Sequence, residues 1–193
     1  NDDAYRTAIA LHGAGLLVPA VLDARPGGGG PLVQAARDLG IRVMTGRAIV
    51  GVRGRGRVAG VKVGLHAGEG AVLEEIACDA LAMSGGWSPV VHLWSHCGGK
   101  LTWDEAQAMF RPDATRPPTG ADGQGFVTCV GAANGHLGTA AVLADAGAAL
   151  PVEAPEEAPL LPVWIMPQGA GVKLRQKMWL DYQNDVKVSD VQL

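Results

Sequence analysis

Cysteine is scarce in this chain of 193 residues, and the few cysteines present lie far apart. There are three of them, Cys78, Cys97 and Cys129, an odd number with no C-x-x-C pair. Such a pattern does not provide a disulfide framework, and it fits a reducing compartment better than an oxidising one. We therefore expect a cytoplasmic protein.

Long apolar runs and clustered basic residues are also missing. No apolar stretch approaches the roughly 20 residues that span a bilayer, and the N-terminus lacks the basic start and apolar block of a signal peptide. The 16 Lys and Arg residues are scattered and the formal net charge is -3, so no basic stripe suits a nucleic acid backbone. The sequence predicts neither membrane insertion nor nucleic acid binding.

Familiar catalytic signatures are absent as well. The chain contains no G-x-S-x-G elbow, no P-loop and no H-x-E zinc signature. His92 and His96 have a spacing compatible with a transition metal, but no clear third ligand accompanies them, which favours packing or interface histidines. Cys129, within an apolar segment, is interpreted as an inert buried thiol. The sequence therefore predicts no catalytic residue and no metal site.

Helices and short apolar strands alternate at the start of the chain. We expect a helix from Ala4 to Ala14 and a buried strand from Leu16 to Leu22. A second helix is expected from Leu32 to Leu39, and a second strand from Ile41 to Met44. Alternation of this kind favours a doubly wound parallel sheet.

Strands in succession are predicted next, separated by glycine-rich turns that suit an antiparallel meander. The strand-like segments are Ala48–Arg53, Val58–Leu65, Val72–Ala77 and Asp79–Met83. A short helix is then expected over Val90–Cys97, followed by an irregular region, Lys100–Gly125, with Asp104 and Glu105 at a helix start. Prolines and glutamates after Leu150 predict a linker into a tail that packs on another domain or subunit.

The most informative segment runs from Phe126 to Leu150. A short apolar strand, Phe126–Val130, leads through small residues into an alanine-rich helix. Gly131 and Gly135 allow backbone angles closed to other residues, and the unpaired N–H groups of a helix's first turn favour a phosphate. This arrangement predicts a nucleotide site. The alternative, in which the small residues only permit tight packing, stays open here.

Asp23 ends the first predicted strand, where many nucleotide folds place an acidic residue that accepts hydrogen bonds from a ribose. The usual G-x-G-x-x-G turn is absent, and Asn1-Asp2-Asp3 stands in its place with carboxylates that repel a pyrophosphate. A ribose contact and a plain solvent-facing strand end therefore both remain open for Asp23.

Several separated segments, taken in order, resemble one protein family. They are Asn1–Arg6, Ala82–Leu93, Gly131–Gly135 and Gln183–Leu193, and the Ser-Gly-Gly-Trp-Ser-Pro and Gln-Asn-Asp-Val blocks are the most specific parts. On these motifs, and over essentially its whole length, the chain resembles the α subunit of heterotetrameric sarcosine oxidases. Because it begins at Asn1 rather than Met, we expect a piece of a longer protein.

The resemblance implies a fold and a reaction. The implied fold is α/β and Rossmann-like, with two dinucleotide-binding halves as in disulfide-reductase-like flavoproteins and an antiparallel meander. Residues 1–83 would form an inserted nucleotide-binding subdomain without its first strand, 84–150 the second half of a larger FAD/NAD-binding-like domain, and 151–193 a linker and interface tail. The parent complex would convert sarcosine to glycine, with hydrogen peroxide and formaldehyde or methylenetetrahydrofolate as products.

The resemblance also implies cofactors and partners. This subunit would bind NAD, the parent complex would hold FAD and FMN, and tetrahydrofolate would bind in the domain that follows. The partners would be the β, γ and δ subunits. In the larger flavoprotein family a Gly-Asp pair touches the flavin, whereas here Ala132 follows Gly131, which fits a differently bound NAD.

Asn134 is the polar member of the predicted cofactor site, since its side chain can donate and accept hydrogen bonds without adding charge beside phosphates. The residues expected to approach NAD are Gly131, Ala132, Ala133, Asn134 and Gly135, with Ser84, Gly85 and Gly86 lining the same crevice and Asp23 and Asn1 as secondary candidates in the other nucleotide half.

Two other functions stay open. One is a nucleotide-stabilised scaffold subunit of a related amine, proline or opine dehydrogenase complex, without catalytic residues of its own. The other is an NAD(P)H-dependent reductase fragment with a redox thiol, which the lack of C-x-x-C disfavours.

Overall fold

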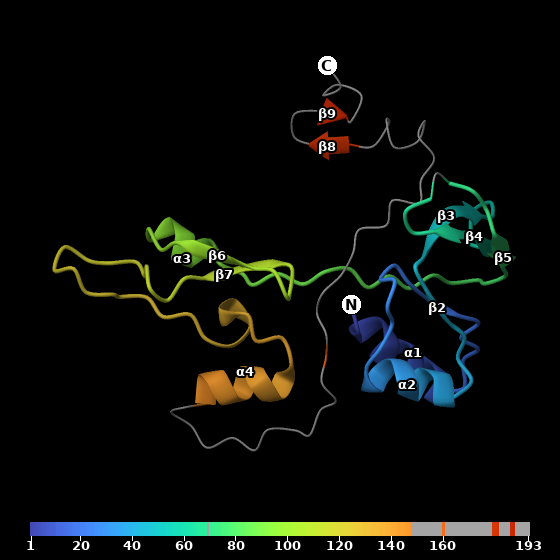
Figure 1. Cartoon of the computed structure of the whole chain (residues 1–193), viewed down its shortest axis with the longest axis horizontal. Coiled ribbons are helices and arrows are strands. Elements are labelled where there is room, and N and C mark those ends of the chain that lie inside the picture. Colours follow the sequence, from blue (N-terminus) through green and yellow to red (C-terminus); the bar gives the residue numbers. More distant parts are fainter. Residues whose placement is uncertain (69, 148–159, 161–178, 182–185, 188–193) are drawn as a thin grey trace. The chain divides into compact units, whose positions relative to one another are not determined.

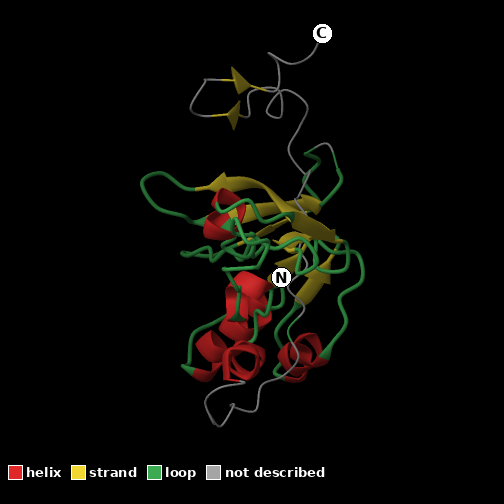
Figure 2. Cartoon of the chain, turned by 90° about the vertical axis from the view of Figure 1, so that its left-hand side faces the viewer, coloured by secondary structure: helices red, strands yellow, loops and turns green. Residues whose placement is uncertain are grey.

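The computed structural model describes residues 1–68, 70–147, 160, 179–181 and 186–187 (Figure 1). Its described residues form two compact units. The meander unit comprises Ala4–Met83 together with the described residues after 164, and the turn unit joins Asn1–Asp3 to the described residues from Ser84 to 160. Each unit contains helices and at least one small sheet, so the fold is mixed α/β. Figure 2 shows the helices in red and the strands in yellow.

The meander unit opens with helices and parallel strands. The elements are α1 (Asp3–Gly13), β1 (Val21–Asp23), α2 (Pro31–Asp38) and β2 (Val43–Thr45). β1 and β2 pair in parallel, with Val21 opposite Val43, and α2 is the crossover between them. Val33 and Ala36 of α2 are buried in one cluster with Tyr5 of α1, so both helices cover this core. The predicted alternation of helices with parallel strands is confirmed.

The first strand is shorter than its apolar sequence predicts. Leu16 and Leu17 lie outside β1, and Leu17 is 89% exposed. In the described chain β1 pairs with the three-residue β2, so the ladder ends where that partner ends. An apolar run indicates where a strand can form, whereas its length depends on the partner strand.

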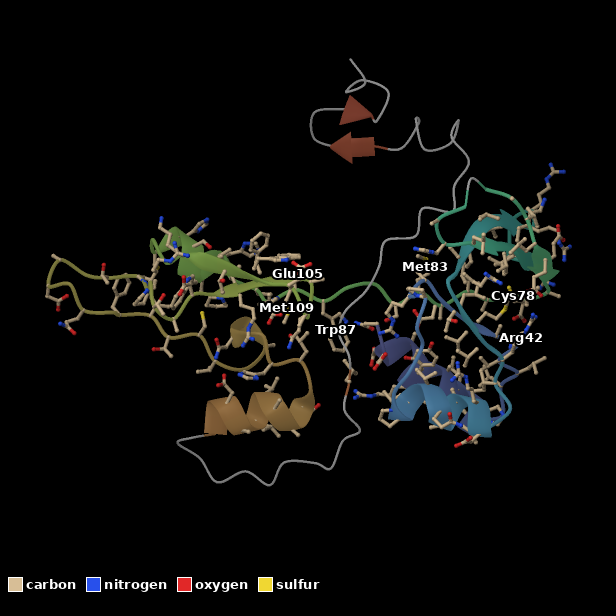
Figure 3. The ribbon with its side chains drawn as sticks, in the orientation of Figure 1. Arg42, Cys78, Met83, Trp87, Glu105 and Met109 are labelled. Carbon is tan, nitrogen blue, oxygen red and sulfur yellow. The ribbon has the colours of Figure 1, made fainter. Side chains whose placement is uncertain are left out.

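The predicted meander is also confirmed. β3 (Arg47–Arg53), β4 (Gly60–Leu65) and β5 (Glu74–Ile76) form an antiparallel sheet in chain order. Arg42, which Figure 3 labels, donates two hydrogen bonds to Glu74 of this sheet, of 2.8 and 3.0 Å. The fourth strand predicted over residues 79–83 was wrong, because that segment pairs with no strand and Met83 is 88% exposed.

The turn unit contains α3 (His92–His96), β6 (Leu101–Asp104), β7 (Met109–Pro112), a 3-10 helix η1 (Gly131–Asn134) and α4 (Thr139–Ala146). The helices α3 and α4 confirm two predictions. The irregular region expected from Lys100 onward was wrong, because β6 and β7 form an antiparallel hairpin there. Asp104 therefore ends a strand and Glu105 lies in the hairpin turn, rather than at a helix start.

The segment before the glycines is extended but joins no sheet among the described residues. Phe126–Val130 forms no strand, and the nearby ladder contact is an isolated bridge between Thr119 and Gly125. The predicted strand was therefore wrong, because an apolar run without a neighbouring backbone forms no ladder.

The linker and tail predicted for residues 151–193 lie almost entirely outside the described residues. Within that range the structure describes β8 (Trp179–Asp181) and β9 (Val186–Lys187), which pair in an antiparallel way. Among the described helices, none has the length and apolar character needed to cross a bilayer.

Candidate nucleotide-binding turn and hollow

The glycine turn, Gly131–Gly135, consists of η1 and the residue that follows it. Gly131 and Gly135 have φ angles of 60° and 89°, in the left-handed region that favours glycine. A Cβ atom on Gly131 would lie 3.0 Å from Val142 Cγ1, and one on Gly135 would lie 2.5 Å from Arg111 Nε. The tight packing considered from the sequence is therefore present, and both glycines meet a steric requirement of the turn itself.

Asp145 of α4 holds one side of the glycine turn. Its Oδ2 accepts hydrogen bonds from the Gly131 N–H at 2.6 Å and from Asn134 Nδ2 at 3.4 Å, and its Oδ1 lies 3.4 Å from His136 Nε2. The Gly131 N–H is the main reason that the pKa of Asp145 lies below its usual range. The carboxylate is therefore ionised at neutral pH.

Arg111 of β7 holds the other side. Its Nε and Nη2 donate to the Asn134 backbone oxygen at 3.2 and 2.9 Å, and its Nη1 lies 3.2 Å from Asp104 Oδ2. The hairpin thereby positions the turn. No motif in the sequence identifies Arg111, Asp104 or Asp145 as turn residues, because Arg111 lies 23 residues and Asp145 lies 11 residues from Asn134.

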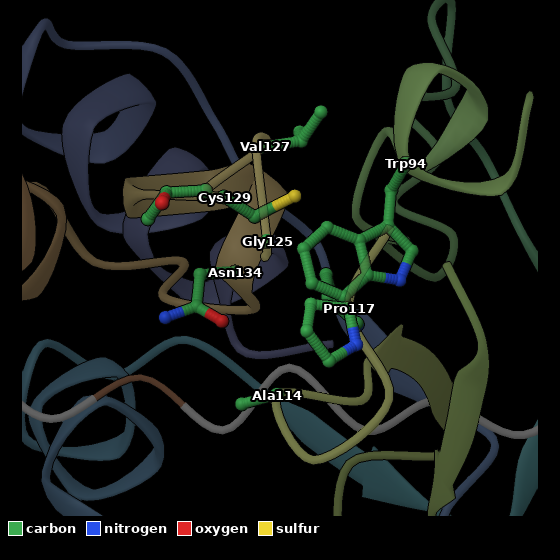
Figure 4. A pocket seen from close by; sticks show the side chains of 9 residues that line it. Trp94, Ala114, Pro117, Gly125, Val127, Cys129 and Asn134 are labelled. Carbon is green, nitrogen blue, oxygen red and sulfur yellow. The ribbon is translucent and has the colours of Figure 1, made fainter. Parts of the chain in front are cut away.

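A hollow of about 370 Å³ lies beside the turn (Figure 4). Its volume is at the lower end of the range of about 300–1,000 Å³ found for small-molecule sites. None of its lining side chains carries a formal charge at neutral pH. The lining residues are Trp94, Pro112, Ala114, Pro117, Gly125, Val127, Thr128, Cys129 and Asn134.

Three lining side chains define the chemistry of the hollow. The Trp94 indole is buried, and its N–H donates to the Lys100 carbonyl at 2.7 Å, so the ring offers the hollow an apolar surface. Burial raises the pKa of the Cys129 thiol, and a neutral thiol is a weak nucleophile. The Asn134 oxygen lies on the side of its amide that faces Pro117 and Trp94, opposite the nitrogen (Figure 4).

Ser84 and Asn1, two other predicted site residues, contact each other in the turn unit. Ser84 Oγ donates to Asn1 Oδ1 at 2.7 Å, and the same oxygen accepts from the Asp3 N–H at 3.2 Å. Ser84, Gly85 and Gly86 are exposed, and none of them lines the hollow. In the described structure no hydrogen bond joins residues 84–86 to the glycine turn.

Asp23 lies in the meander unit, at the end of β1, within a buried cluster. It accepts hydrogen bonds from the Tyr5 hydroxyl at 2.7 Å and from the Nε, Nη2 and backbone N–H groups of Arg25 at 2.7–3.1 Å. The Arg25 and Asp23 side chains are 9% and 8% exposed. Burial raises the pKa of Asp23, but the hydrogen bonds from Arg25 and Tyr5 lower it by a larger amount. The pKa of Asp23 therefore lies below its usual value. The solvent-facing strand end considered for Asp23 is therefore wrong.

The two spaced histidines lie at the ends of α3 and are both exposed. Within the described residues no group of three His, Cys, Asp or Glu side chains is placed to hold a metal ion.

Comparison with known proteins leads to the same family as the sequence motifs. No protein-family model matches the chain. Sarcosine oxidase subunit alpha from Rhizobium meliloti (strain 1021) is 32% identical and aligns with 100% of this chain and 19% of its own length. Those from Corynebacterium sp. strains P-1 and U-96 are 34% and 33% identical, over 99% of this chain and 21% of their length.

The chain thus spans about a fifth of the length of these relatives. The resemblance inferred from the motifs is confirmed: over its whole length, this chain is similar to one segment of sarcosine oxidase alpha subunits.

Proposed function

We propose that this segment binds NAD as part of the alpha subunit of a sarcosine oxidase complex. The complex oxidatively demethylates sarcosine to glycine, and it produces hydrogen peroxide with formaldehyde or methylenetetrahydrofolate. The observation that carries the proposal is the 32–34% identity of the whole chain to sarcosine oxidase alpha subunits. In this proposal the segment supplies a binding surface, and the residues that oxidise the amine lie elsewhere in the complex.

The proposal includes the surrounding assembly. FAD and FMN belong to other parts of the complex, tetrahydrofolate to the domain that follows this segment, and the β, γ and δ subunits are the partners. The fold is a Rossmann-like pair of nucleotide-binding halves divided near residues 83 and 150. The parallel β1–α2–β2 arrangement supports this fold, because such a crossover is the building block of dinucleotide-binding domains.

The NAD contacts are assigned first to the glycine turn. Hydrogen bonds from the glycine turn to Asp145 and from Arg111 to the turn favour one fixed conformation of it, which lowers the entropic cost of binding NAD. Ser84, Gly85 and Gly86 are proposed to line the same crevice, with Asn1 beside them as a secondary candidate. Asp23 is also secondary, because a ribose would compete there with Tyr5 and Arg25.

The NAD affinity of the complete alpha subunit tests this assignment. Asn134→Asp adds a carboxylate next to Asp145, and Gly131→Leu places a side chain against Val142 at a positive φ. We expect each change to weaken NAD binding at least about tenfold, or about 1.4 kcal/mol. Gly147→Ala is the control, since its φ is -92° and a Cβ there meets open space. Unchanged affinity in both variants rejects the assignment.

A nucleotide-stabilised scaffold of a related amine, proline or opine dehydrogenase complex is the second candidate function. The neutral Cys129 thiol is a weak nucleophile, which favours a segment without its own catalytic residues. Sarcosine-dependent peroxide release by the purified complex supports the first function. Bound nucleotide without sarcosine turnover supports the second, and NADH oxidation by the subunit alone would indicate the reductase.

A further inference from the structure

We propose that the hollow beside Asn134 receives the adenine ring of the nucleotide, and that Asn134 Oδ1 accepts a hydrogen bond from the exocyclic amine of that ring. This inference rests on the proposed NAD binding and adds which part of the molecule the hollow holds. Four observations support it: the size of the hollow, its apolar walls, the orientation of the Asn134 amide, and the charge around the glycine turn.

Size and walls favour a single flat ring. A hollow of about 370 Å³ is small for a whole dinucleotide, because it lies near the lower limit for drug-sized ligands. Trp94, Pro117 and Val127 provide apolar walls, and Trp94 is fixed by its hydrogen bond to Lys100. Any nucleobase can stack on an aromatic side chain, since every base presents a π face.

The orientation of the Asn134 amide selects a hydrogen-bond donor on the ligand. An ionised carboxylate can only accept hydrogen bonds, so the Asn134 nitrogen faces Asp145 and the oxygen faces the hollow. In the described structure no group donates to this oxygen, because the hydrogen bonds of Asn134 involve its Nδ2 and its backbone oxygen. An amide group is also the side chain that pairs most readily with the amine edge of adenine.

The charge around the turn disfavours a phosphate at this point. The Gly131 N–H, which could bind an anion, already donates to the Asp145 carboxylate at 2.6 Å. Arg111 is likewise engaged by Asp104 and by the Asn134 backbone oxygen. An uncharged ring therefore fits the hollow, and the phosphates of the same nucleotide would lie outside it.

Binding of single nucleotides to the complete, nucleotide-depleted alpha subunit in its complex tests the proposal. AMP carries the exocyclic amine, IMP has a carbonyl oxygen in its place, and nicotinamide mononucleotide lacks adenine. We expect AMP to bind at least about tenfold more tightly than IMP, because the carbonyl oxygen would face Asn134 Oδ1 without a proton between them. Asn134→Leu should remove this discrimination, and Gly147→Ala, a control outside the hollow with open space around its Cβ, should retain it.

Alkylation of Cys129 at alkaline pH, where its thiol can ionise, gives a second measurement that needs no variant. The Cys129 thiol lines the hollow, so a bound ring should shield it from iodoacetamide. Peptide mass spectrometry should show protection by AMP and NAD but not by nicotinamide mononucleotide.

The outcomes separate the two proposals. NAD binding without discrimination between AMP and IMP, and without protection of Cys129, overturns the adenine assignment and leaves NAD binding standing. Protection by nicotinamide mononucleotide alone also overturns it, since the other end of the dinucleotide would then occupy the hollow. Failure of the complete subunit to bind NAD at all overturns the proposed function, and the adenine assignment with it.

Discussion

Asp23 and Arg25, at the end of β1, form an ion pair that is almost completely removed from water. The fully buried Tyr5 hydroxyl adds a hydrogen bond from α1, and burial together with Asp23 raises the pKa of Tyr5 well above its usual range. Buried hydrogen bonds between charged groups are stronger than those between neutral groups. This cluster therefore links α1 to β1 through charge as well as packing.

Asp23→Asn should destabilise the meander unit strongly. We expect a loss of about 1.5–3 kcal/mol in unfolding free energy at neutral pH, because the Arg25 guanidinium loses its charge-assisted hydrogen bonds to the Asp23 carboxylate. Tyr5→Phe is the control, which removes one hydrogen bond and should cost about 0.5–1.5 kcal/mol. Hydrogen exchange of β1 and β2 amides in the complete subunit measures both. Similar losses in the two variants would contradict a structural role for the ion pair.

The same pair sets a pH dependence. Because the pKa of Asp23 in the folded state lies below its ordinary value of 3.8, the ionised carboxylate stabilises the fold above that pH. This stabilisation is lost as the pH falls through the folded-state pKa. Protection of the β1 and β2 amides should therefore decrease below about pH 4, and less steeply in Asp23→Asn.

The sequence places Asp23 at a strand end but does not reveal its burial. Tyr5, which donates to it, lies 18 residues earlier, and only the packing of α1 beside β1 brings the two together. The same limit applies to Asp145 and Arg111, whose contacts with the glycine turn depend on how α4 and the hairpin pack. The residue types of the glycine turn indicated the turn itself. The side chains that support it could be identified only from the tertiary structure.

At the scale of secondary structure elements, helices were predicted better than strands. The helices α1, α2 and α4 have local signals, such as glycine stops and a proline at the start of α2, and they lie close to their predicted positions. The β6–β7 hairpin was missed because Asp104 and Glu105 resemble a helix start. Its cross-strand contact between Trp103 and Phe110, with ring centroids 5.0 Å apart, appears only when both strands are present.

Gly135 makes the hairpin and the glycine turn one structural element, because its lack of a side chain leaves room for Arg111. Gly135→Ala should displace the guanidinium from the Asn134 oxygen and force an alanine to a φ near 89°. We expect a cost of about 1–3 kcal/mol. Hydrogen exchange in β7 and α4 measures it.

Gly147→Ala, at a φ of -92° and with no atom near its Cβ, is the matched control. If both variants show native protection, Arg111 does not depend on the space at Gly135.

At the scale of the whole molecule, the segment that joins the two units has no regular structure. The residues between β5 and α3 form no helix or strand, and Met83 within them is 88% exposed. Exposed backbone of this kind is where proteases cut first.

Limited proteolysis of the complete subunit should therefore cleave between Leu81 and Trp87 before it cleaves at Trp94, which is 4% exposed. Added NAD should slow this cleavage, because Ser84, Gly85 and Gly86 are proposed nucleotide contacts. Earlier cleavage at Trp94 would contradict the burial of the indole, and equal rates with and without NAD would count against residues 84–86 as contacts.

Asn1 and Ser84 are 83 positions apart in the sequence, yet a hydrogen bond of 2.7 Å joins their side chains. The chain therefore departs from the turn unit and returns to it at neighbouring points, on either side of Ala4–Met83. Because its entry and exit are adjacent, such a block could be replaced by a short connecting segment while the turn unit keeps its own contacts. Evolution can exchange such a block, and with it any specificity that the block carries, without rebuilding the glycine turn.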